Sequence, residues 1–166
     1  MVNPSVSCLH DQVSRLVLED LDLQGSFESL TALTQLRVLN LKQNRLSSPI
    51  PNLSNFTALK LLFLSHNDFS GEFSPSMPTL FQLYCLNLLY NNFSGEVPIS
   101  VNSLTHLLTL QLEENQFFDS ISDQNLPNLQ DFNVSGNRFS GFSADIVLGY
   151  QQNNNWICVL VYSYSK

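Results

Sequence analysis

The side chains that could carry acid–base or metal chemistry are few and poorly spaced in this 166-residue sequence. His10, His66 and His106 lie far apart, and no two of them have the spacing of a metal-ligand pair. Glu113 and Glu114 are adjacent, so alternation along a strand would separate their carboxylates unless the strand had already ended. The sequence contains no nucleophile elbow, phosphate-binding loop or kinase signature. We therefore expect a non-catalytic protein with no metal ion and no cofactor.

One polar side chain does recur at a fixed spacing, and its chemistry is hydrogen bonding. Steps of 23, 24, 24 and 22 residues separate the five asparagines Asn44, Asn67, Asn91, Asn115 and Asn137. Each closes the phrase Leu-x-Leu-x-x-Asn-x-(Leu/Phe), except that the last copy starts Phe-x-Val and that a first copy has Leu21 in the asparagine place. An inward amide offers two donors and an acceptor to a bent backbone, and buried backbone groups need such partners. We interpret these asparagines as a structural ladder rather than as catalytic or metal-binding residues.

The phrase around each asparagine predicts the element that positions it. In Leu-x-Leu the leucines point to one side of a short strand and the residue between them points to the other. One coil cannot bury its own apolar edge, so this period predicts a stacked solenoid whose neighbouring coils share a continuous core. Apolar residues at three-residue spacing precede each strand, as in Leu30-x-x-Leu33-x-x-Leu36, and this spacing suits a 3₁₀ turn on the opposite side.

A further column follows the asparagines and holds glycine in four copies, with serine or aspartate in the other two. Its members are Gly25, Ser48, Gly71, Gly95, Asp119 and Gly141. Glycine suggests a positive φ or a crowded backbone, and aspartate tolerates a positive φ better than most residues. We therefore expect a left-handed or crowded backbone position in each coil.

The repeated phrases resemble the plant-specific leucine-rich repeat, whose consensus is close to LxxLxxLxxLxLxxNxLSGxIP. The resemblance runs from about Val13 to Gly141, and six copies agree in register. The stretches 15–25 and 131–138 also resemble repeats of plant receptor-like kinases with short ectodomains. The resemblance implies an α/β solenoid, a right-handed superhelix with a parallel β-sheet on its concave side and a mostly 3₁₀ or irregular convex side.

The same resemblance implies a function. The chain would be a protein- or peptide-binding module, the extracellular recognition part of a receptor-like kinase at the plasma membrane, with the kinase domain absent from this chain. Its partner would be a peptide or protein ligand, or another receptor ectodomain. Two alternatives are a truncated stand-alone decoy or scaffold without signalling output, and a secreted inhibitor of cell-wall-degrading enzymes, whose repeats look similar.

Both ends of the sequence depart from the repeat. We expect a remnant of an N-terminal cap over 1–12, about six repeats with a degenerate first coil over 13–141, and a non-repeat tail over 142–166. No secretory signal is readable at the start, and three cysteines (Cys8, Cys85 and Cys158) argue against a complete disulfide framework. The tail is either non-homologous sequence or a segment whose residues 156–162 form an edge strand over the last coil. Those residues are far fewer than the roughly 20 that a membrane helix needs.

Composition and charge narrow the range of partners. A hydrophobic share of 43% is enough for a core, so we expect one elongated folded domain. The formal net charge of -7 argues against nucleic acid, which needs a basic face, and against anionic membrane surfaces. We expect no membrane insertion by this chain itself.

The residues that alternate with the inward leucines form the candidate binding surface. In the middle coils they are apolar or aromatic where the pattern predicts solvent, and such clusters often mark binding sites. Neighbouring acids favour a basic patch on the partner. The candidates are Leu61, Phe63, His66, Asn87, Leu89, Tyr90, Gln111, Glu113 and Glu114. The alternative is that neighbouring side chains cover one another and that nothing binds there.

Four Asn-x-Ser/Thr sequons are candidate glycosylation sites in a secreted chain. They begin at Asn52, Asn55, Asn92 and Asn133. Asparagine is abundant in this sequence, so chance matches are expected. Asn133 belongs to the predicted concave face, where a glycan would block the C-terminal end of that face.

Overall fold

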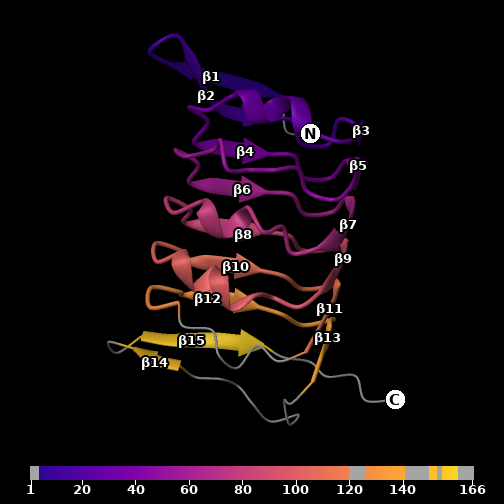
Figure 1. Ribbon diagram of the computed structural model, residues 1–166, viewed down its shortest axis with the longest axis vertical. Coiled ribbons are helices and arrows are strands. Elements are labelled where there is room, and N and C mark those ends of the chain that lie inside the picture. Colours follow the sequence, from indigo (N-terminus) through magenta and orange to yellow (C-terminus); the bar gives the residue numbers. More distant parts are fainter. Residues whose placement is uncertain (1–3, 120–125, 141–149, 153–154, 161–166) are drawn as a thin grey trace.

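The computed structural model describes residues 4–119, 126–140, 150–152 and 155–160, which form a stack of coils (Figure 1). Among these residues, one sheet of nine strands runs along the whole stack in the order β1-β2-β4-β6-β8-β10-β12-β15-β14. The strands are β1 Ser5–Leu9, β2 Gln12–Val17, β4 Val38–Asn40, β6 Leu61–Phe63, β8 Cys85–Asn87, β10 Thr109–Gln111, β12 Asp131–Asn133, β15 Asn155–Leu160 and β14 Tyr150–Gln152. Each pair from β2 to β15 is parallel, which confirms the predicted solenoid. We number coils 1 to 6 by the strands β2, β4, β6, β8, β10 and β12.

The Leu-x-Leu phrases form this long sheet because their leucines fill the interior. Leu39 pairs with Leu62, and Leu62 pairs with Leu86, across neighbouring strands. All three leucines are fully buried. A slip of one residue would turn these side chains to the opposite face of the sheet. The apolar pattern therefore determines the register of the strands.

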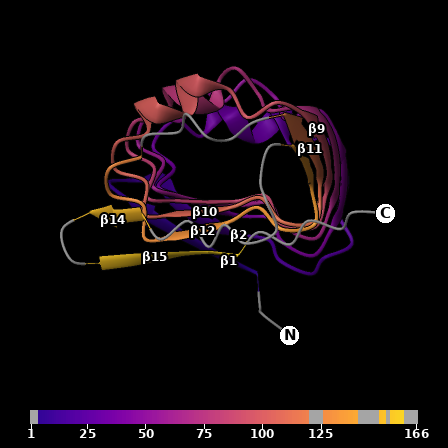
Figure 2. The same ribbon diagram turned by 90° about the horizontal axis from the view of Figure 1, so that it is seen from below.

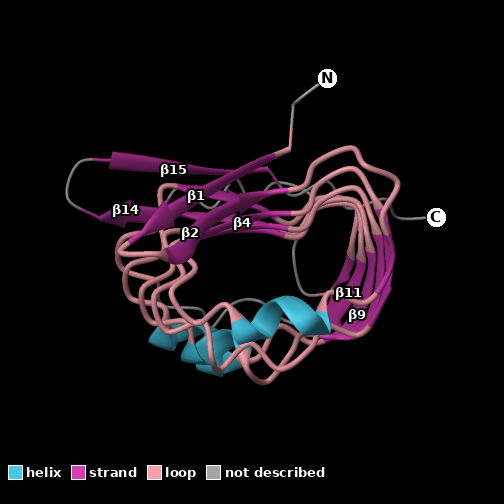
Figure 3. Ribbon diagram, turned by 90° about the horizontal axis from the view of Figure 1, so that it is seen from above, coloured by secondary structure: helices cyan, strands magenta, loops and turns pink. Residues whose placement is uncertain are grey.

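The side opposite the long sheet consists of short helical turns and loops (Figure 3). In the described ranges these include three 3₁₀ helices, η1 Glu28–Ala32, η2 Met77–Thr79 and η3 Ile99–Ser103. The apolar residues at three-residue spacing face the core, since Met77, Leu80 and Leu83 are all buried. This arrangement confirms the predicted 3₁₀ turns.

A second parallel sheet, which the sequence did not predict, closes one flank of the coils (Figure 2). Its strands are β3 Gln24–Gly25, β5 Arg45–Ser48, β7 Asp68–Glu72, β9 Asn92–Gly95, β11 Gln116–Asp119 and β13 Arg138–Phe139. From β5 onward, each strand begins directly after a ladder asparagine. The predicted positive φ column lies in this sheet, at Gly25, Gly71, Gly95, Ser48 and Asp119. Gly141, the last member of that column, lies outside the described residues.

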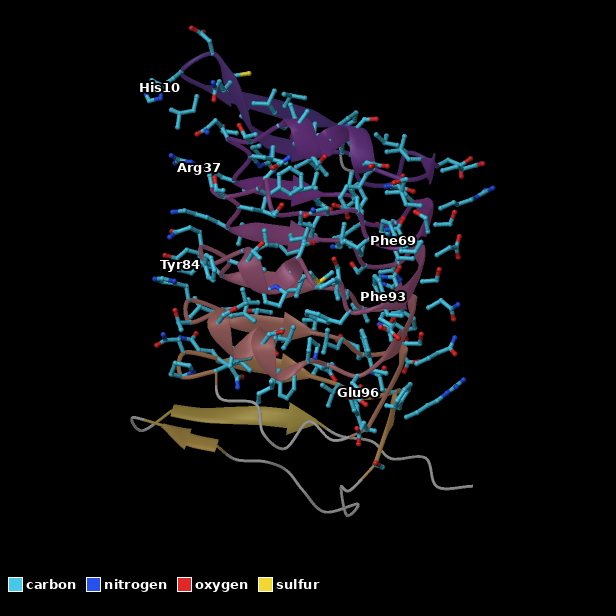
Figure 4. The ribbon with its side chains drawn as sticks, viewed as in Figure 1. His10, Arg37, Phe69, Tyr84, Phe93 and Glu96 are labelled. Carbon is cyan, nitrogen blue, oxygen red and sulfur yellow. The ribbon has the colours of Figure 1, made fainter. Side chains whose placement is uncertain are left out.

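Phenylalanines stack on one another along this flank, where Figure 4 labels Phe69 and Phe93. The ring centroids of Phe69 and Phe93 are 6.2 Å apart, and those of Phe93 and Phe117 are 6.1 Å apart. Phe139 continues the stack at 6.4 Å from Phe117. Phe69, Phe93 and Phe117 are fully buried, so this stack forms a second column of the core beside the leucines.

The asparagine ladder joins each coil to the coil before it. The Asn67 Nδ2 donates to the carbonyl oxygen of Leu41 in the preceding coil at 2.9 Å. It also donates to the carbonyls of Leu64 at 3.1 Å and Ser65 at 3.2 Å in its own coil. The Asn67 Oδ1 accepts the backbone N–H of Leu46 at 3.0 Å. The same pattern recurs at Asn44, Asn91, Asn115 and Asn137, so every ladder asparagine hydrogen-bonds the backbone of its own coil and of the coil before it.

Each end of the long sheet carries an antiparallel strand, β1 beside β2 and β14 beside β15. The strand β15 lies parallel to β12, with Cys158 opposite Asp131. Residues 155–160 therefore extend the sheet beyond coil 6, as in the second of the two alternatives for the tail, although β14 and not β15 is the strand at the edge. The domain boundaries near residues 12 and 141 stay predictions.

Candidate ligand-binding surface

The long sheet presents two outward positions per central strand, because each of these strands has only three residues. Strand β6 presents Leu61 and Phe63, strand β8 presents Cys85 and Asn87, and strand β10 ends on Gln111. All five are half-buried. We call this outward surface of β2 to β12 the strand face, and it corresponds to the predicted concave side.

Three residues beyond each strand, the backbone adopts a left-handed conformation with φ between 51° and 65°. These positions are Asp20, Gln43, His66, Tyr90, Glu114 and Gly136. The alternation of the strand predicts an exposed residue directly before this turn, but in coils 3 and 5 that residue is buried. Ser65 is fully buried and Glu113 is only 9% exposed. The prediction that the Glu113 side chain is open to solvent is therefore wrong, whereas its role in ligand binding stays a prediction.

An aromatic pair links coils 3 and 4 at the left-handed positions. The rings of His66 and Tyr90 stack with their centroids 4.8 Å apart and an interplanar angle of 18°. Tyr90 remains 50% exposed. The two residues, which the sequence places in adjacent coils, are thus in direct ring contact. Part of the tyrosine remains accessible to a ligand.

The apolar candidates are less exposed than their outward positions predict. Leu61, Phe63 and Leu89 are half-buried, because the side chains of neighbouring coils lie beside them. Partial cover of this kind reduces the apolar surface that water contacts. These three residues belong to coils 3 and 4, as the aromatic pair does, so the apolar candidates lie in the middle coils of the strand face.

Amide side chains orient the polar part of the strand face. The Oδ1 atoms of Asn40, Asn87 and Asn133 accept the backbone N–H two residues further along, at 3.0, 3.2 and 3.1 Å. The Gln111 Nε2 donates to the Asp131 Oδ2 at 2.6 Å. The orientation of each of these amides is therefore fixed by a hydrogen bond.

The C-terminal part of the strand face is acidic. The backbone N–H of Glu113 and the Asn133 side chain both act to lower the pKa of the Glu113 carboxyl. Its Oε2 is buried and has no hydrogen-bond partner. Burial, and then the nearby charges of Asp131 and Glu114, raise the pKa of Glu113. The sequence identified the two adjacent acids but could not show that one of them is buried.

Replacing Glu113 with glutamine is expected to raise the melting temperature at pH 7 by about 2–4 °C. Because its pKa is raised by burial, Glu113 binds a proton more tightly in the folded chain than in the unfolded chain. That contribution to stability is complete below the ordinary pKa of a glutamate and is lost as the pH rises through the folded-state pKa. Thermal melts of both proteins at pH 4 and pH 7 test this. An equal difference at the two pH values would contradict it.

The two cysteines with described side chains differ in reactivity. Cys8 is exposed, whereas burial, and then the charge of Asp131, raise the pKa of Cys85 to about 11. At pH 8 only about one Cys85 in a thousand would be a thiolate, which is the reactive form. In a Cys158→Ser background, we expect Ellman's reagent to label Cys8 rapidly and Cys85 at least about a hundredfold more slowly. Comparable rates in the folded protein would contradict this, and rates in guanidinium chloride provide the control.

The four sequons differ in how firmly the structure holds their asparagines. Asn52, Asn55 and Asn92 are exposed. Asn133 is half-buried, and its Oδ1 accepts both the N–H and the hydroxyl of Ser135 at 3.1 and 2.9 Å. A glycan is attached to the amide nitrogen, and the half-buried Asn133 leaves less room for it than the three exposed asparagines do, so Asn133 is the poorest of the four candidates.

The described residues lack two kinds of feature. Within them, no group of three or more His, Cys, Asp or Glu residues is arranged to hold a metal ion. Across those same ranges, none of the helices has the length and apolar character needed to cross a membrane.

Part of the chain matches a known family of repeat proteins. The family model described as Leucine Rich Repeat matches residues 35–56 and 58–80. An inactive leucine-rich repeat receptor-like serine/threonine-protein kinase of Arabidopsis thaliana is 53% identical over 75 residues. That alignment covers 44% of this chain and 12% of the kinase, so the chain spans about one eighth of that relative's length.

Solved structures extend the similarity to most of the described coils. The BIR2 ectodomain from Arabidopsis thaliana superimposes with a TM-score of 0.74 at 30% identity, covering 82% of this chain and 75% of that ectodomain. The plant peptide hormone receptor RGFR1, in complex with RGF2, superimposes with a TM-score of 0.71 at 29% identity. This second match covers 76% of the chain and 21% of the receptor.

Proposed function

The chain belongs to the leucine-rich repeat receptor-like kinases of plants, matching part of their ectodomain, and from this we propose that its strand face binds a peptide or protein ligand. The chain would then be the recognition module of a receptor, placed on the extracellular side of the plasma membrane. Another receptor ectodomain is a further partner of the same kind. Signalling would depend on a kinase domain elsewhere in the protein, and the module itself would be non-catalytic.

The observation that carries this proposal is the stacked pair of His66 and Tyr90 beside half-buried apolar side chains. A ring held by stacking loses little conformational freedom when a ligand covers it, which favours binding. Tyrosine is also enriched among the residues that contribute most to protein interfaces. Leu61, Phe63 and Leu89 would supply apolar contact next to the pair. Asn87 and Gln111, whose amides are oriented, would supply polar contacts.

The similar structures support the same reading. RGFR1 is a peptide hormone receptor that was solved with RGF2 bound, and it has the same repeat architecture. A rigid parallel sheet with a repeating side-chain pattern suits an extended ligand, because successive coils can each contact successive residues of that ligand.

Selection of peptides from a displayed library of random 12-residue sequences tests the proposal. The protein used is the purified full chain, and the test variant carries both Phe63→Ser and Tyr90→Ser on the strand face. The matched control is Phe81→Ser, which removes another exposed aromatic ring that lies outside the strands of this face. Circular dichroism and melting temperature establish that each variant is folded.

We expect enriched peptides to bind the unaltered chain and the Phe81→Ser control equally. Binding to the double variant should fall by about tenfold or more, because two anchoring rings are lost. Peptides that bind all three proteins equally, or a library that yields no enriched sequence, would contradict binding at the strand face.

A further inference from the structure

Two glutamates occupy the same position of the repeat, and they differ in one partner. Glu19 follows β2 and Glu113 follows β10, each two residues after the last residue of its strand. The Asn40 Nδ2 donates to the Glu19 Oε2 at 2.7 Å. The Lys42 Nζ lies 3.7 Å from the Glu19 Oε1. The Glu19 carboxylate of coil 1 therefore has two partners from coil 2, a hydrogen bond from an asparagine and the charge of a lysine.

Coils 5 and 6 repeat this arrangement without the lysine. Asn133 stands in the place of Asn40, because Gln111 pairs with Asn133 as Val17 pairs with Asn40. The Asn133 side chain lies close enough to the Glu113 carboxyl to favour its charged form, as a polar neighbour in the place of Asn40 should. The place of Lys42, two residues further along, is taken by Ser135.

The backbone hydrogen bonds around Glu19 and around Glu113 are the same, so the two positions differ in their side chains. The N–H of Asp20 donates to the Lys42 carbonyl at 3.0 Å, and the N–H of Glu114 donates to the Ser135 carbonyl at 2.9 Å. The serine hydroxyl donates to the Asn133 Oδ1 instead of to the carboxylate. Glu113 is more than nine-tenths buried, and its Oε2 has no hydrogen-bond partner. Buried polar atoms normally have such a partner.

Two more carboxylates surround this position. Asp131 raises the pKa of Glu113 through its charge, as Glu114 also does. The Glu114 side chain reaches over coil 6, since a Cβ added at Gly136 would lie 2.5 Å from the Glu114 Oε1. The two salt bridges within the described residues use Lys42 and Arg45, neither of which pairs with these acids. The Glu113 carboxyl thus has two acids near enough to affect it and a serine where the equivalent place in coil 2 has an ammonium.

We propose that Glu113, with Glu114 and Asp131, forms a seat for a lysine or arginine side chain supplied by the ligand. The cation of the ligand would take the place that Lys42 takes beside Glu19. A metal ion is a poorer occupant, because within the described residues no group of acids has the arrangement of a metal site. The inference rests on the proposed binding of a peptide or protein at the strand face, and it specifies one feature of that ligand.

The seat lies in the coil next to Tyr90, and this position predicts a second feature of the ligand. The N–H of Tyr90 donates to the carbonyl of Glu113 at 3.0 Å, so the tyrosine belongs to the neighbouring coil. A cationic residue in the seat would therefore place an adjacent ligand residue near the exposed face of Tyr90. The ligand class is a peptide or protein segment with lysine or arginine next to an apolar or aromatic residue.

A small probe tests the seat without knowledge of the natural ligand. The probe is N-acetyl-lysine N-methylamide, and N-acetyl-norleucine N-methylamide is its uncharged control. The readout is the ¹³C NMR shift of the Glu113 side-chain carboxyl during a pH titration of the full chain. We expect the lysine compound to lower the pKa of Glu113, because a nearby cation favours the charged form. The norleucine compound should leave it unchanged, and equal effects of the two compounds would overturn the proposal.

Variants at Ser135 separate charge from bulk. Ser135→Lys recreates the arrangement of coil 2, so the protein should fill its own seat. It should lower the pKa of Glu113 and remove the response to the probe. Ser135→Met adds a side chain of similar length without charge, and it should not lower the pKa of Glu113. A pKa that responds equally to both substitutions would show that no cation seat exists.

The displayed peptides distinguish failure of this inference from failure of the proposed function. We expect enriched sequences to contain lysine or arginine at a shared position, and Glu113→Gln to weaken them by about tenfold or more. The control Glu19→Gln, whose equivalent seat is already filled by Lys42, should bind them unchanged. Peptides that depend on Phe63 and Tyr90 but neither contain a shared cation nor respond to Glu113→Gln would overturn the seat alone. Peptides that ignore the strand face would overturn both proposals.

Discussion

Replacing Asn67 with alanine is expected to lower the free energy of unfolding by about 3–5 kcal/mol. The substitution removes four hydrogen bonds at once, three to carbonyl oxygens and one from the N–H of Leu46. Asn67 is buried, so water cannot replace all of these bonds. Each buried backbone group left without a partner costs about 1–3 kcal/mol. Guanidinium chloride unfolding followed by circular dichroism measures the change.

Two variants test the origin of this loss. Asn67→Asp keeps an acceptor for Leu46 but removes the donors to the three carbonyls, so it should destabilise the protein as well, and more strongly at neutral pH than in acid. Asn55→Ala removes an exposed asparagine and should change stability by less than about 0.5 kcal/mol. If Asn67→Ala were as mild as Asn55→Ala, the ladder would not be a major source of stability.

Replacing Phe93 with alanine should cost a similar amount, about 3–5 kcal/mol, through loss of packing. Phe93 is fully buried between Phe69 and Phe117, and its ring stacks on both. Removing it would leave a cavity in the middle of the stack that the neighbouring rings cannot fill without shifting. The same denaturant experiment measures this change, and the slope of the transition reveals whether unfolding remains a single step.

Leucine at the same place provides the control for Phe93. Leu46 occupies the equivalent position of coil 2 and is almost fully buried there. Phe93→Leu should therefore cost much less than Phe93→Ala, because part of the volume is retained. Equal losses for the two variants would mean that ring stacking, and not filled volume, dominates at this position.

The repeat period allowed much of the fold to be predicted from the sequence. The Leu-x-Leu phrases predicted the strands of the long sheet, since leucines at alternate positions must share one face. The recurring asparagines predicted the ladder for a chemical reason, the ability of an amide to satisfy a bent backbone. The second sheet was missed because each of its longer strands, β5, β7, β9 and β11, buries only one apolar side chain. One buried apolar residue gives no alternation from which a strand could be recognised.

The candidate surface was harder to predict, because it depends on where each strand stops. The left-handed position at Glu114 follows the strand by three residues, so the alternation of the strand no longer indicates the exposure of Glu113, which is almost fully buried. The residue type does not reveal that turn, since its position holds aspartate, glutamine, histidine, tyrosine, glutamate and glycine in the six coils. Only its place directly before the ladder asparagine recurs in coils 2 to 6, and that place gives no reason to expect a left-handed backbone. The burial of Glu113 also depends on Asn133, which is contributed by the next coil.

The asparagine ladder gives the stack a direction. Each amide holds the bend of its own coil and also receives the N–H of Leu46, Phe69 or their equivalents from the coil before it. If the C-terminal coil unfolds, the preceding coil therefore loses the asparagine side chain that accepts its backbone N–H. A coil peeled from the N-terminal end would leave every remaining bend among coils 2 to 6 with its own asparagine. We therefore expect unfolding of the solenoid to begin more easily at its C-terminal coil than at its N-terminal coil.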